Sequence, residues 1–284
     1  MQPTKTERLR IGDVALHVQD WGGEGRPILF AHPTGFLGAV WLPIIRRLRD
    51  AGFDGKVYTY DQRGHGLSSK PDAGYDWSLF VSDTVELVGA LAIRDALGVG
   101  HSAGATTLAC VAAAVPGSFR RLVMIDPILF DPADAHLLER GDNPMATRTR
   151  NRRLVWASRG EIFESYRARP PYDTWTDEAL RAYIEHGTFE RPDGEVELLC
   201  PGRIEAQIYE NAASVDGCAC LAELDIPVRL VRGGRSTSFS GDRVERACAA
   251  LNDGELITID EATHYVPMEF PDEVARLVLA ALGP

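Results

Sequence analysis

The chain has 284 residues, of which 45% are hydrophobic and 25% are charged, and its formal net charge at pH 7 is −11. These are ordinary globular proportions, and the length suffices for one sizeable core with an insertion or for two modest domains. The acidic balance argues against nucleic acids and anionic membranes as partners, because no cationic face is available to neutralise phosphates.

No apolar run approaches the ~20 residues of a membrane span, and the N-terminal segment is too polar for a signal peptide. The five cysteines stand at positions 110, 200, 218, 220 and 248. Their number is odd and their spacing lacks the paired ligands of a zinc site. We therefore expect free thiols in a reducing cytoplasm, no metal and no membrane partner.

Short apolar runs alternate with helical patterns along the first 130 residues, which is typical of a sheet whose strands are covered on both faces. In chain order the expected elements are a hairpin over 8–20, a strand over 27–31, a helix over 41–48, a strand over 56–60, a helix over 77–93, a strand over 96–99, a helix over 105–115 and a strand over 121–125.

From residue 131 to 222 the alternation of strands and helices stops. No strand is expected there, and proline-containing breaks separate helical patches at 146–158, 161–168, 176–186 and 203–214. The alternation then resumes with a strand over 227–231, a helix over 242–251, a strand over 255–259 and a terminal helix begun by Pro271. The pattern predicts an α/β core domain, 1–130 and 223–284, with a parallel sheet between helices, and a helical cap (lid) domain, 131–222.

Residues 100–104 read Gly-His-Ser-Ala-Gly, a G-x-S-x-G sequence between a predicted strand and a predicted helix. In this context the motif indicates a sharp turn that exposes the Ser102 hydroxyl at a helix N-terminus, where developing negative charge is favoured. Gly100 and Gly104 lack side chains, so strand and helix can approach closely. We predict that Ser102 is a nucleophile.

A serine hydroxyl needs a base, and His264 follows the last predicted strand, at the rim where the other strands also end. The imidazole in turn needs a carboxylate. Asp126 ends the strand beside that of Ser102 and is our first choice. Asp242, which opens a predicted helix after the 227–231 strand, is the alternative, and a site without an acid is a third.

An oxyanion formed at Ser102 needs two N–H donors. The first is the N–H of Ala103, the residue after the nucleophile. The second is expected from the turn after the 27–31 strand. Pro33 has no N–H, so we choose Thr34, with Gly35 or Phe36 as alternatives if the turn is shifted.

Four ordered motifs, at residues 32–36, 61–68, 100–104 and 263–264, together resemble the α/β-hydrolase fold superfamily, over essentially the whole chain. The resemblance implies a mostly parallel eight-stranded sheet and cofactor-free hydrolysis through an acyl-enzyme beneath a cap. Two departures stand out: Pro33 replaces a usual glycine, and Ser236 and Thr237 occupy the loop where most members carry the acid. Some members, including lactone-cleaving hydrolases, place the acid where Asp126 stands. A serine nucleophile disfavours the haloalkane-dehalogenase and epoxide-hydrolase branches.

We expect a serine hydrolase acting on a small apolar ester or lactone, with Phe36, Ile128, Trp156 and Val266 contacting the substrate. A homo-oligomer is the further partner that we consider. Four arginines at 148, 150, 152 and 153 could meet a substrate carboxylate, although a solvated helix face is favoured. A carbon–carbon bond hydrolase, an aminopeptidase, a ligand receptor with little turnover and a scaffold with a degenerate site remain alternatives.

Overall fold

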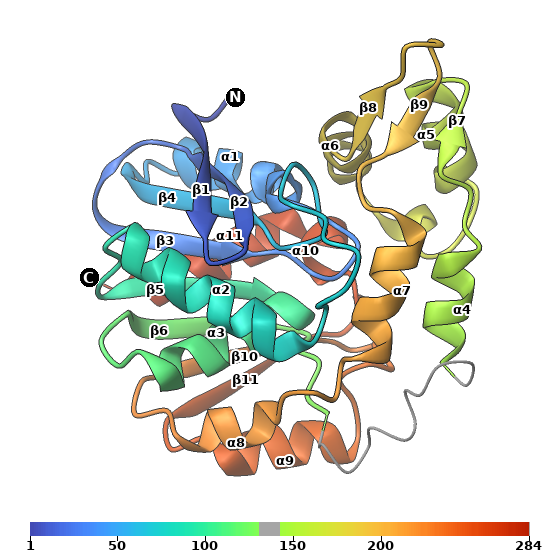
Figure 1. The fold of residues 1–284 in the computed structure, drawn as a ribbon. Helices are drawn as coiled ribbons and strands as arrows, with labels where there is room; N and C mark the ends of the chain where they lie inside the picture. Colours follow the sequence, from blue (N-terminus) through green and yellow to red (C-terminus); the bar gives the residue numbers. More distant parts are fainter. Residues whose placement is uncertain (131–142, 284) are drawn as a thin grey trace.

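A computed structural model describes residues 1–130 and 143–283. Its central feature is an eight-stranded sheet with the strand order β1-β2-β4-β3-β5-β6-β10-β11 (Figure 1). β1 and β2 pair antiparallel, as do β2 and β4, and the remaining neighbours are parallel. The strands are β1 (Lys5–Ile11), β2 (Val14–Asp20), β3 (Glu24–Ala31), β4 (Gly55–Asp61), β5 (Ala96–His101), β6 (Phe119–Ile125), β10 (Val228–Gly233) and β11 (Gly254–Ile259).

Helices cover both faces of this sheet, which confirms the predicted fold class (Figure 1). α1 (Leu42–Asp50) and α11 (Pro271–Leu282) pack on one face. The opposite face carries α2 (Trp77–Ala90), α3 (Ala103–Ala114), α8 (Gly217–Ala222) and α9 (Asp242–Ala250). A 3₁₀ turn (Gly38–Trp41) precedes α1, and α10 (Val266–Glu269) precedes α11.

The central strands are apolar throughout because both of their faces are buried. In β3, Ile28 and Phe30 join the core on the α1 side, whereas Leu29 and Ala31 join the core on the α3 side. The parallel register brings the carboxyl ends of β3, β5, β6 and β10 to one rim of the sheet. Loops that follow these strands are therefore neighbours in space even where they are far apart in sequence.

The elements between Pro144 and Glu210 form a layer beside that rim, which we call the cap (Figure 1). Its helices are α4 (Pro144–Arg150), α5 (Arg159–Arg167), α6 (Asp177–His186) and α7 (Gly202–Glu210), with a 3₁₀ turn (Tyr172–Thr174) between α5 and α6. The expectation that strands vanish here is wrong. A small antiparallel sheet pairs β7 (Val155–Trp156), β9 (Val196–Leu198) and β8 (Thr188–Glu190) in that order.

The error has a physical cause, since strands of two or three residues are too short to show a period of two. The helix expected over 146–158 ends at Arg150, and β7 occupies its last third. The break at 192–194 is the turn of a β8–β9 hairpin, with Gly194 at φ +83°. The division of the chain into two domains stays a prediction, and its boundary near residue 131 lies outside the described residues.

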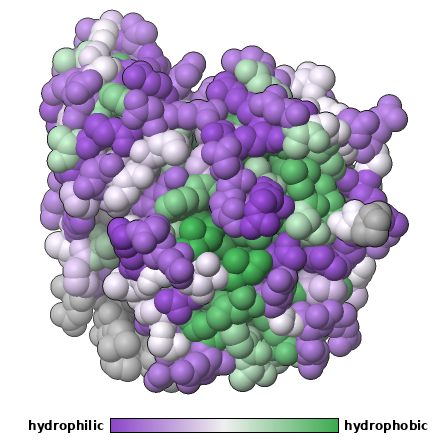
Figure 2. All heavy atoms as spheres, turned by 180° about the vertical axis from the view of Figure 1, so that it is seen from behind, coloured by the Kyte–Doolittle hydropathy of each residue, from purple (hydrophilic) through white to green (hydrophobic). Residues whose placement is uncertain are grey.

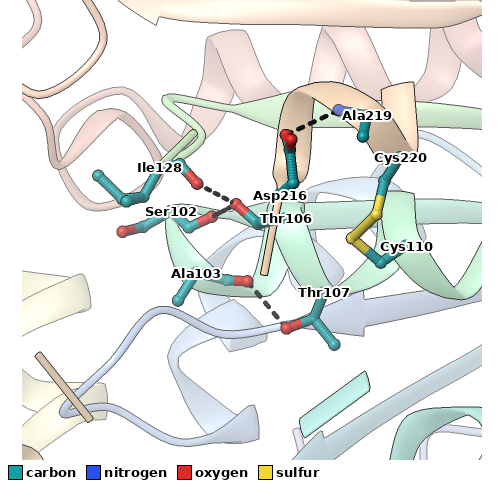
Figure 3. The surroundings of a disulfide bond; sticks show 9 residues. All are labelled: Ser102, Ala103, Thr106, Thr107, Cys110, Ile128, Asp216, Ala219 and Cys220. Atoms are coloured by element: carbon teal, nitrogen blue, oxygen red, sulfur yellow. Dashed lines mark hydrogen bonds between the residues drawn. A yellow bond between two sulfur atoms is a disulfide. The ribbon is translucent and has the colours of Figure 1, made fainter. Parts of the chain in front are cut away.

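α8, which we assigned to the cap by sequence, packs against α3 on the core sheet and is joined to it covalently (Figure 3). Cys110 of α3 and Cys220 of α8 form a disulfide, with their Cα atoms 4.9 Å apart. The expectation that all five cysteines are free thiols is therefore wrong. Spacing along the chain carried no signal for this pair, because its two members are 110 residues apart and meet only through helix packing.

The face carrying α1 and α11 shows a band of hydrophobic surface within hydrophilic surroundings (Figure 2). Partly buried apolar residues of α11 on this face include Leu279 and Leu282. The expected self-association stays a prediction. Among the described residues, no helix has the length and apolar character needed to cross a membrane.

Candidate active site

Ser102 lies at the sharp turn between β5 and α3, with backbone angles φ 55° and ψ −122°. A non-glycine residue in this region is strained and persists only where its surroundings hold it. The two flanking glycines explain how. A Cβ on Gly100 would lie 2.4 Å from the Ala105 Cα, and one on Gly104 would lie 2.4 Å from the Ala31 carbonyl oxygen. The turn therefore forms only with glycine at both positions, as the motif predicts.

The structure brings Ser102, His264 and Asp126 into one hydrogen-bonded row. His264 Nε2 lies 3.0 Å from Ser102 Oγ, and His264 Nδ1 lies 2.7 Å from Asp126 Oδ1. The Asp126 carboxylate is fully buried, whereas the imidazole side chain remains 19% exposed. Such a row can hold one imidazole tautomer, leaving Nε2 to accept the serine proton.

The Asp126 carboxylate is anchored on both oxygens. Oδ1 also accepts the hydroxyl of Ser236 at 2.6 Å, and Oδ2 accepts the N–H of Gly233 at 2.9 Å. Asp126 itself has φ +43°, the second strained position at this rim. The alternative acid, Asp242, lies exposed at the first position of α9 and forms no bond to His264.

His101, which precedes the serine, forms its side-chain hydrogen bond with the backbone of His264. The His101 Nε2–H donates to the His264 carbonyl oxygen at 2.8 Å, so the His101 ring holds the backbone of His264 in place. Complete burial lowers the pKa of His101 well below its usual value. The ring is consequently neutral and places no charge beside His264.

Two backbone N–H groups beside Ser102 have no hydrogen-bond partner among the described residues. Ala103 is the first residue of α3, where an N–H has no acceptor within its own helix. Thr34 lies in the turn after β3 and lines the same pocket as Ser102. These two groups are those expected from the sequence.

The other N–H groups considered for this role are already used. Gly35 donates to the buried Nε2 of His65 at 2.9 Å, and Phe36 donates to the Pro33 carbonyl at 3.3 Å. Of the three turn residues weighed from the sequence, Thr34 alone keeps an N–H without a partner among the described residues.

Two buried histidines hold this turn in place. His32 Nδ1–H donates to the Pro33 carbonyl at 2.8 Å, and its Nε2 accepts the N–H of Gln62 at 2.9 Å. His65 Nδ1–H donates to the Arg63 carbonyl at 2.9 Å. Burial lowers the pKa of His32 to about 4 and that of His65 well below its usual value, so both rings are neutral. The 61–68 motif is thus structural support for the turn.

Ser102 and His264 open into a pocket of about 430 Å³ between the rim and the cap. Phe36 and Ile128, which we expect from the sequence to contact the substrate, are among the residues that line it. The remaining lining residues come from both layers: Pro33, Thr34, Trp77, Phe130, Asn143, Met145, Tyr209, Ala212, Thr237, Ser238, Arg243 and Tyr265.

Trp156 and Val266, which we expect from the sequence to contact the substrate, are not among the described residues that line this pocket. Trp156 is 3% exposed, meets Tyr166 edge-on at 5.7 Å and is covered by the Arg153 guanidinium. Val266 is completely buried at the start of α10. Both side chains belong to the hydrophobic core that includes α1 and α11.

The four arginines at 148–153 do not line the pocket either. Arg150 and Arg153 pair with Glu210 and Glu161. Arg152 is not on a solvated face, since its guanidinium lies 2.6 Å from the buried carboxylate of Glu205. Burial raises the pKa of Glu205, and the arginine opposes that shift.

Sequence reasoning missed Ser236, Tyr209 and Arg243. Ser236 lies in the loop after the 227–231 strand, where most members of the superfamily carry the acid. The missing acid in this loop was the one sequence signal for Ser236, because a hydroxyl at that place can only hydrogen-bond to an acid that stands elsewhere in the chain. No sequence signal pointed to Tyr209 or Arg243. Each lies on an ordinary amphipathic helix, and only the packing of that helix turns its side chain to the pocket. Among the described residues, no cluster of three His, Cys, Asp or Glu side chains could hold a metal ion.

Comparison with known proteins agrees with this architecture. Residues 28–277 match the model of the Alpha/beta hydrolase family. A 2-(acetamidomethylene)succinate hydrolase from Mesorhizobium japonicum is 30% identical over 279 residues, covering 96% of this chain and 93% of the relative. The crystal structure of an E-2-(acetamidomethylene)succinate hydrolase superposes with a TM-score of 0.83 at 27% identity, covering 99% of both chains. The non-heme chloroperoxidase CPO-A1 of Kitasatospora aureofaciens is 38% identical over 96 residues, about a third of each chain. The chain therefore belongs to the alpha/beta hydrolase family.

Proposed function

We propose that this protein is a serine hydrolase that cleaves a carboxylic ester or lactone through an acyl-enzyme. The observation that carries the proposal is the row Ser102–His264–Asp126, with separations of 3.0 and 2.7 Å, at the wall of a pocket. A serine hydroxyl is too weak a nucleophile without a base in hydrogen-bond reach, and this row supplies one.

In the proposed mechanism, His264 Nδ1–H donates to Asp126, and Nε2 removes the proton of Ser102 as Oγ attacks the carbonyl carbon. The carbonyl oxygen becomes an oxyanion, which the N–H groups of Ala103 and Thr34 bind. His264 then gives its proton to the departing alkoxide. In the second half, His264 activates water, which attacks the acyl-enzyme and releases the acid.

The test uses the p-nitrophenyl esters of acetate and hexanoate with the wild type and Ser102→Ala. We expect turnover of the wild type to fall roughly 10⁴- to 10⁶-fold in the variant, because the nucleophile is lost. A mass increase equal to the acyl group, located on Ser102 after rapid quenching, would establish the intermediate.

Release that is equally fast in Ser102→Ala would refute the proposal. Ligand-induced stabilisation of the wild type without any release from these esters would favour the receptor alternative instead.

A second candidate is the cleavage of an amide bond on the same residues. The observation favouring it is the relative of 30% identity, whose name describes a substrate with an acetamide C–N bond. Incubation with 2-(acetamidomethylene)succinate decides between the two. Acetate release that depends on Ser102 and exceeds the rate on esters would favour the amide, and ester turnover without acetate release would exclude it.

A further inference from the structure

The pocket that holds Ser102 and His264 also contains one arginine, Arg243 in the first turn of α9. No other arginine or lysine, and no aspartate or glutamate, is among the lining residues that the structure describes. The Arg243 guanidinium carbon lies 5.2 Å from the centroid of the Phe130 ring, so the planar group is seated on an aromatic face.

Among the described residues, this guanidinium uses little of its hydrogen-bonding capacity. Its one bond in the described part of the chain is from Nη1 to the Ser238 carbonyl, at 3.3 Å. No carboxylate of the described residues lies within ion-pair distance of it, whereas the buried Arg63 is held by Asp83 at 2.7 Å. A guanidinium has five N–H donors, so Arg243 can still bind an acceptor that enters the pocket.

We propose that the substrate carries a carboxylate and that Arg243 binds it; this inference rests on the proposed ester hydrolysis at Ser102. The planar fork of an arginine matches the two oxygens of a carboxylate. A phosphate dianion would call for further cations, and the described lining residues supply none besides Arg243. Thr237 and Ser238 line the same pocket, and their hydroxyl groups can complete the solvation of one carboxylate.

The pocket size limits the substrate further. A volume of about 430 Å³ admits a small molecule, and Trp77, Ile128 and Phe130 supply apolar walls between its polar groups. The chemical class is therefore a small ester with a carboxylate on its acyl part or on its alcohol part. The sequence predicts a small apolar ester or lactone. The substrate proposed here differs from that prediction in carrying one anionic end.

Two matched pairs of esters test this class. In the first pair, 4-nitrophenyl hydrogen adipate carries a carboxylate on the acyl part and 4-nitrophenyl hexanoate does not. In the second, 4-acetoxybenzoate carries it on the alcohol part and its methyl ester is neutral. The measured quantity is the ratio of kcat/KM, anionic over neutral, for wild type, Arg243→Gln and the control Arg246→Gln. Arg246 is an exposed arginine of the same helix, so its variant loses the same charge.

We expect Arg243→Gln to lower this ratio about 10- to 100-fold for one of the two pairs, as loss of a charged hydrogen-bond pair does. Arg246→Gln is expected to leave both ratios unchanged. The inference is overturned if Arg243→Gln leaves both ratios within about twofold of the wild type, or if Arg246→Gln lowers them equally.

Calorimetric binding of adipate and of 4-hydroxybenzoate to Ser102→Ala, with and without Arg243→Gln, separates this inference from the proposed function. Binding that depends on Arg243 supports the carboxylate site even if no ester is turned over. If neither acid binds more weakly after Arg243→Gln, the carboxylate site is refuted even where esters are hydrolysed through Ser102. Thermal unfolding of each variant confirms that it is folded.

Discussion

The rim of the core sheet and the cap both line the pocket, but they are held by different kinds of contact. At the rim, backbone geometry fixes much of the row: Ser102 and Asp126 have positive φ, and the Gly233 N–H binds one oxygen of the Asp126 carboxylate. In the cap, the lining side chains Met145 and Tyr209 project from α4 and α7. These two helices are joined by the Asn143 side chain, which donates to the Tyr209 carbonyl, and by the ion pair of Arg150 with Glu210.

The packing inside the cap is largely aromatic. Tyr166 and Tyr172 stack with centroids 4.2 Å apart, and Trp175 packs against the Phe36 ring of the core at 5.5 Å. The comparison separates two parts of the proposed site: the groups proposed to move protons lie in loops that follow core strands, whereas the cap contributes part of the wall around them. The four predictions below test this division.

The largest effect is expected at the acid of the rim. Asp126→Asn should lower kcat for p-nitrophenyl esters about 10⁴-fold, because an amide no longer holds the His264 tautomer or stabilises the imidazolium. Steady-state kinetics with the wild type as reference measures the loss.

The control for that prediction is Asp242→Asn, which removes an equal charge from an exposed position. It should leave kcat within about twofold of the wild type, as for most surface substitutions away from special features. If Asp242→Asn were the damaging substitution and Asp126→Asn the silent one, the rim would not be organised as described.

The difference between the two regions also sets what a sequence can predict. The elbow at Ser102 requires glycine at two fixed positions, and Asp126 and His264 stand in the loops that follow β6 and β11, so local sequence locates all three members of the row. The fold class follows from the same alternation of strands and helices. These features depend on backbone sterics and on strand ends, which leave a pattern in a few consecutive residues.

Features produced by contacts between distant segments left no such pattern. The short strands β7, β8 and β9 pair across 40 residues of the cap, and Cys110 meets Cys220 only because α8 lies on α3. Trp156 belongs to the aromatic interior rather than the pocket, a choice that helix and strand periodicity cannot make. Arg243 reaches the pocket through the placement of α9, which no local motif encodes.

The next largest effect concerns the disulfide between Cys110 and Cys220, which joins two helices of the core, α3 and α8, and whose loop along the chain contains the whole cap. Replacing Cys110 and Cys220 together by alanine should lower the free energy of unfolding by about 2–5 kcal/mol, since the unfolded chain gains freedom. Urea denaturation under oxidising conditions measures this difference.

Two controls accompany that measurement. Cys248→Ser, at an exposed cysteine outside the disulfide, should have no effect on the free energy of unfolding. A thiol reductant should destabilise the wild type and leave the double variant unchanged. An equal response of both proteins would show that the two sulfurs are not joined in solution.

A smaller effect is expected at Ser236, whose hydroxyl donates to the oxygen of Asp126 that also receives His264 Nδ1–H. Ser236→Ala removes one of the bonds that orient the carboxylate, and we expect kcat to fall about 10-fold. The diagnostic is a double-mutant cycle, because in the Asp126→Asn background the same substitution should cost almost nothing. Additive losses would mean that Ser236 acts independently of the acid.

The smallest effect, and the one that addresses the cap directly, is expected at Met145, a lining residue that is 45% exposed. Met145→Ala removes apolar contact that ground state and transition state share, so kcat/KM for the hexanoate ester should fall about 2- to 5-fold while kcat stays unchanged. Leu256→Ala is the matched control, because Leu256 is 41% exposed on β11 and does not line the pocket. If Met145→Ala also lowered kcat, the cap would take part in positioning the reacting groups. A pocket wall that only selects substrates does not change the rate at which a bound substrate reacts.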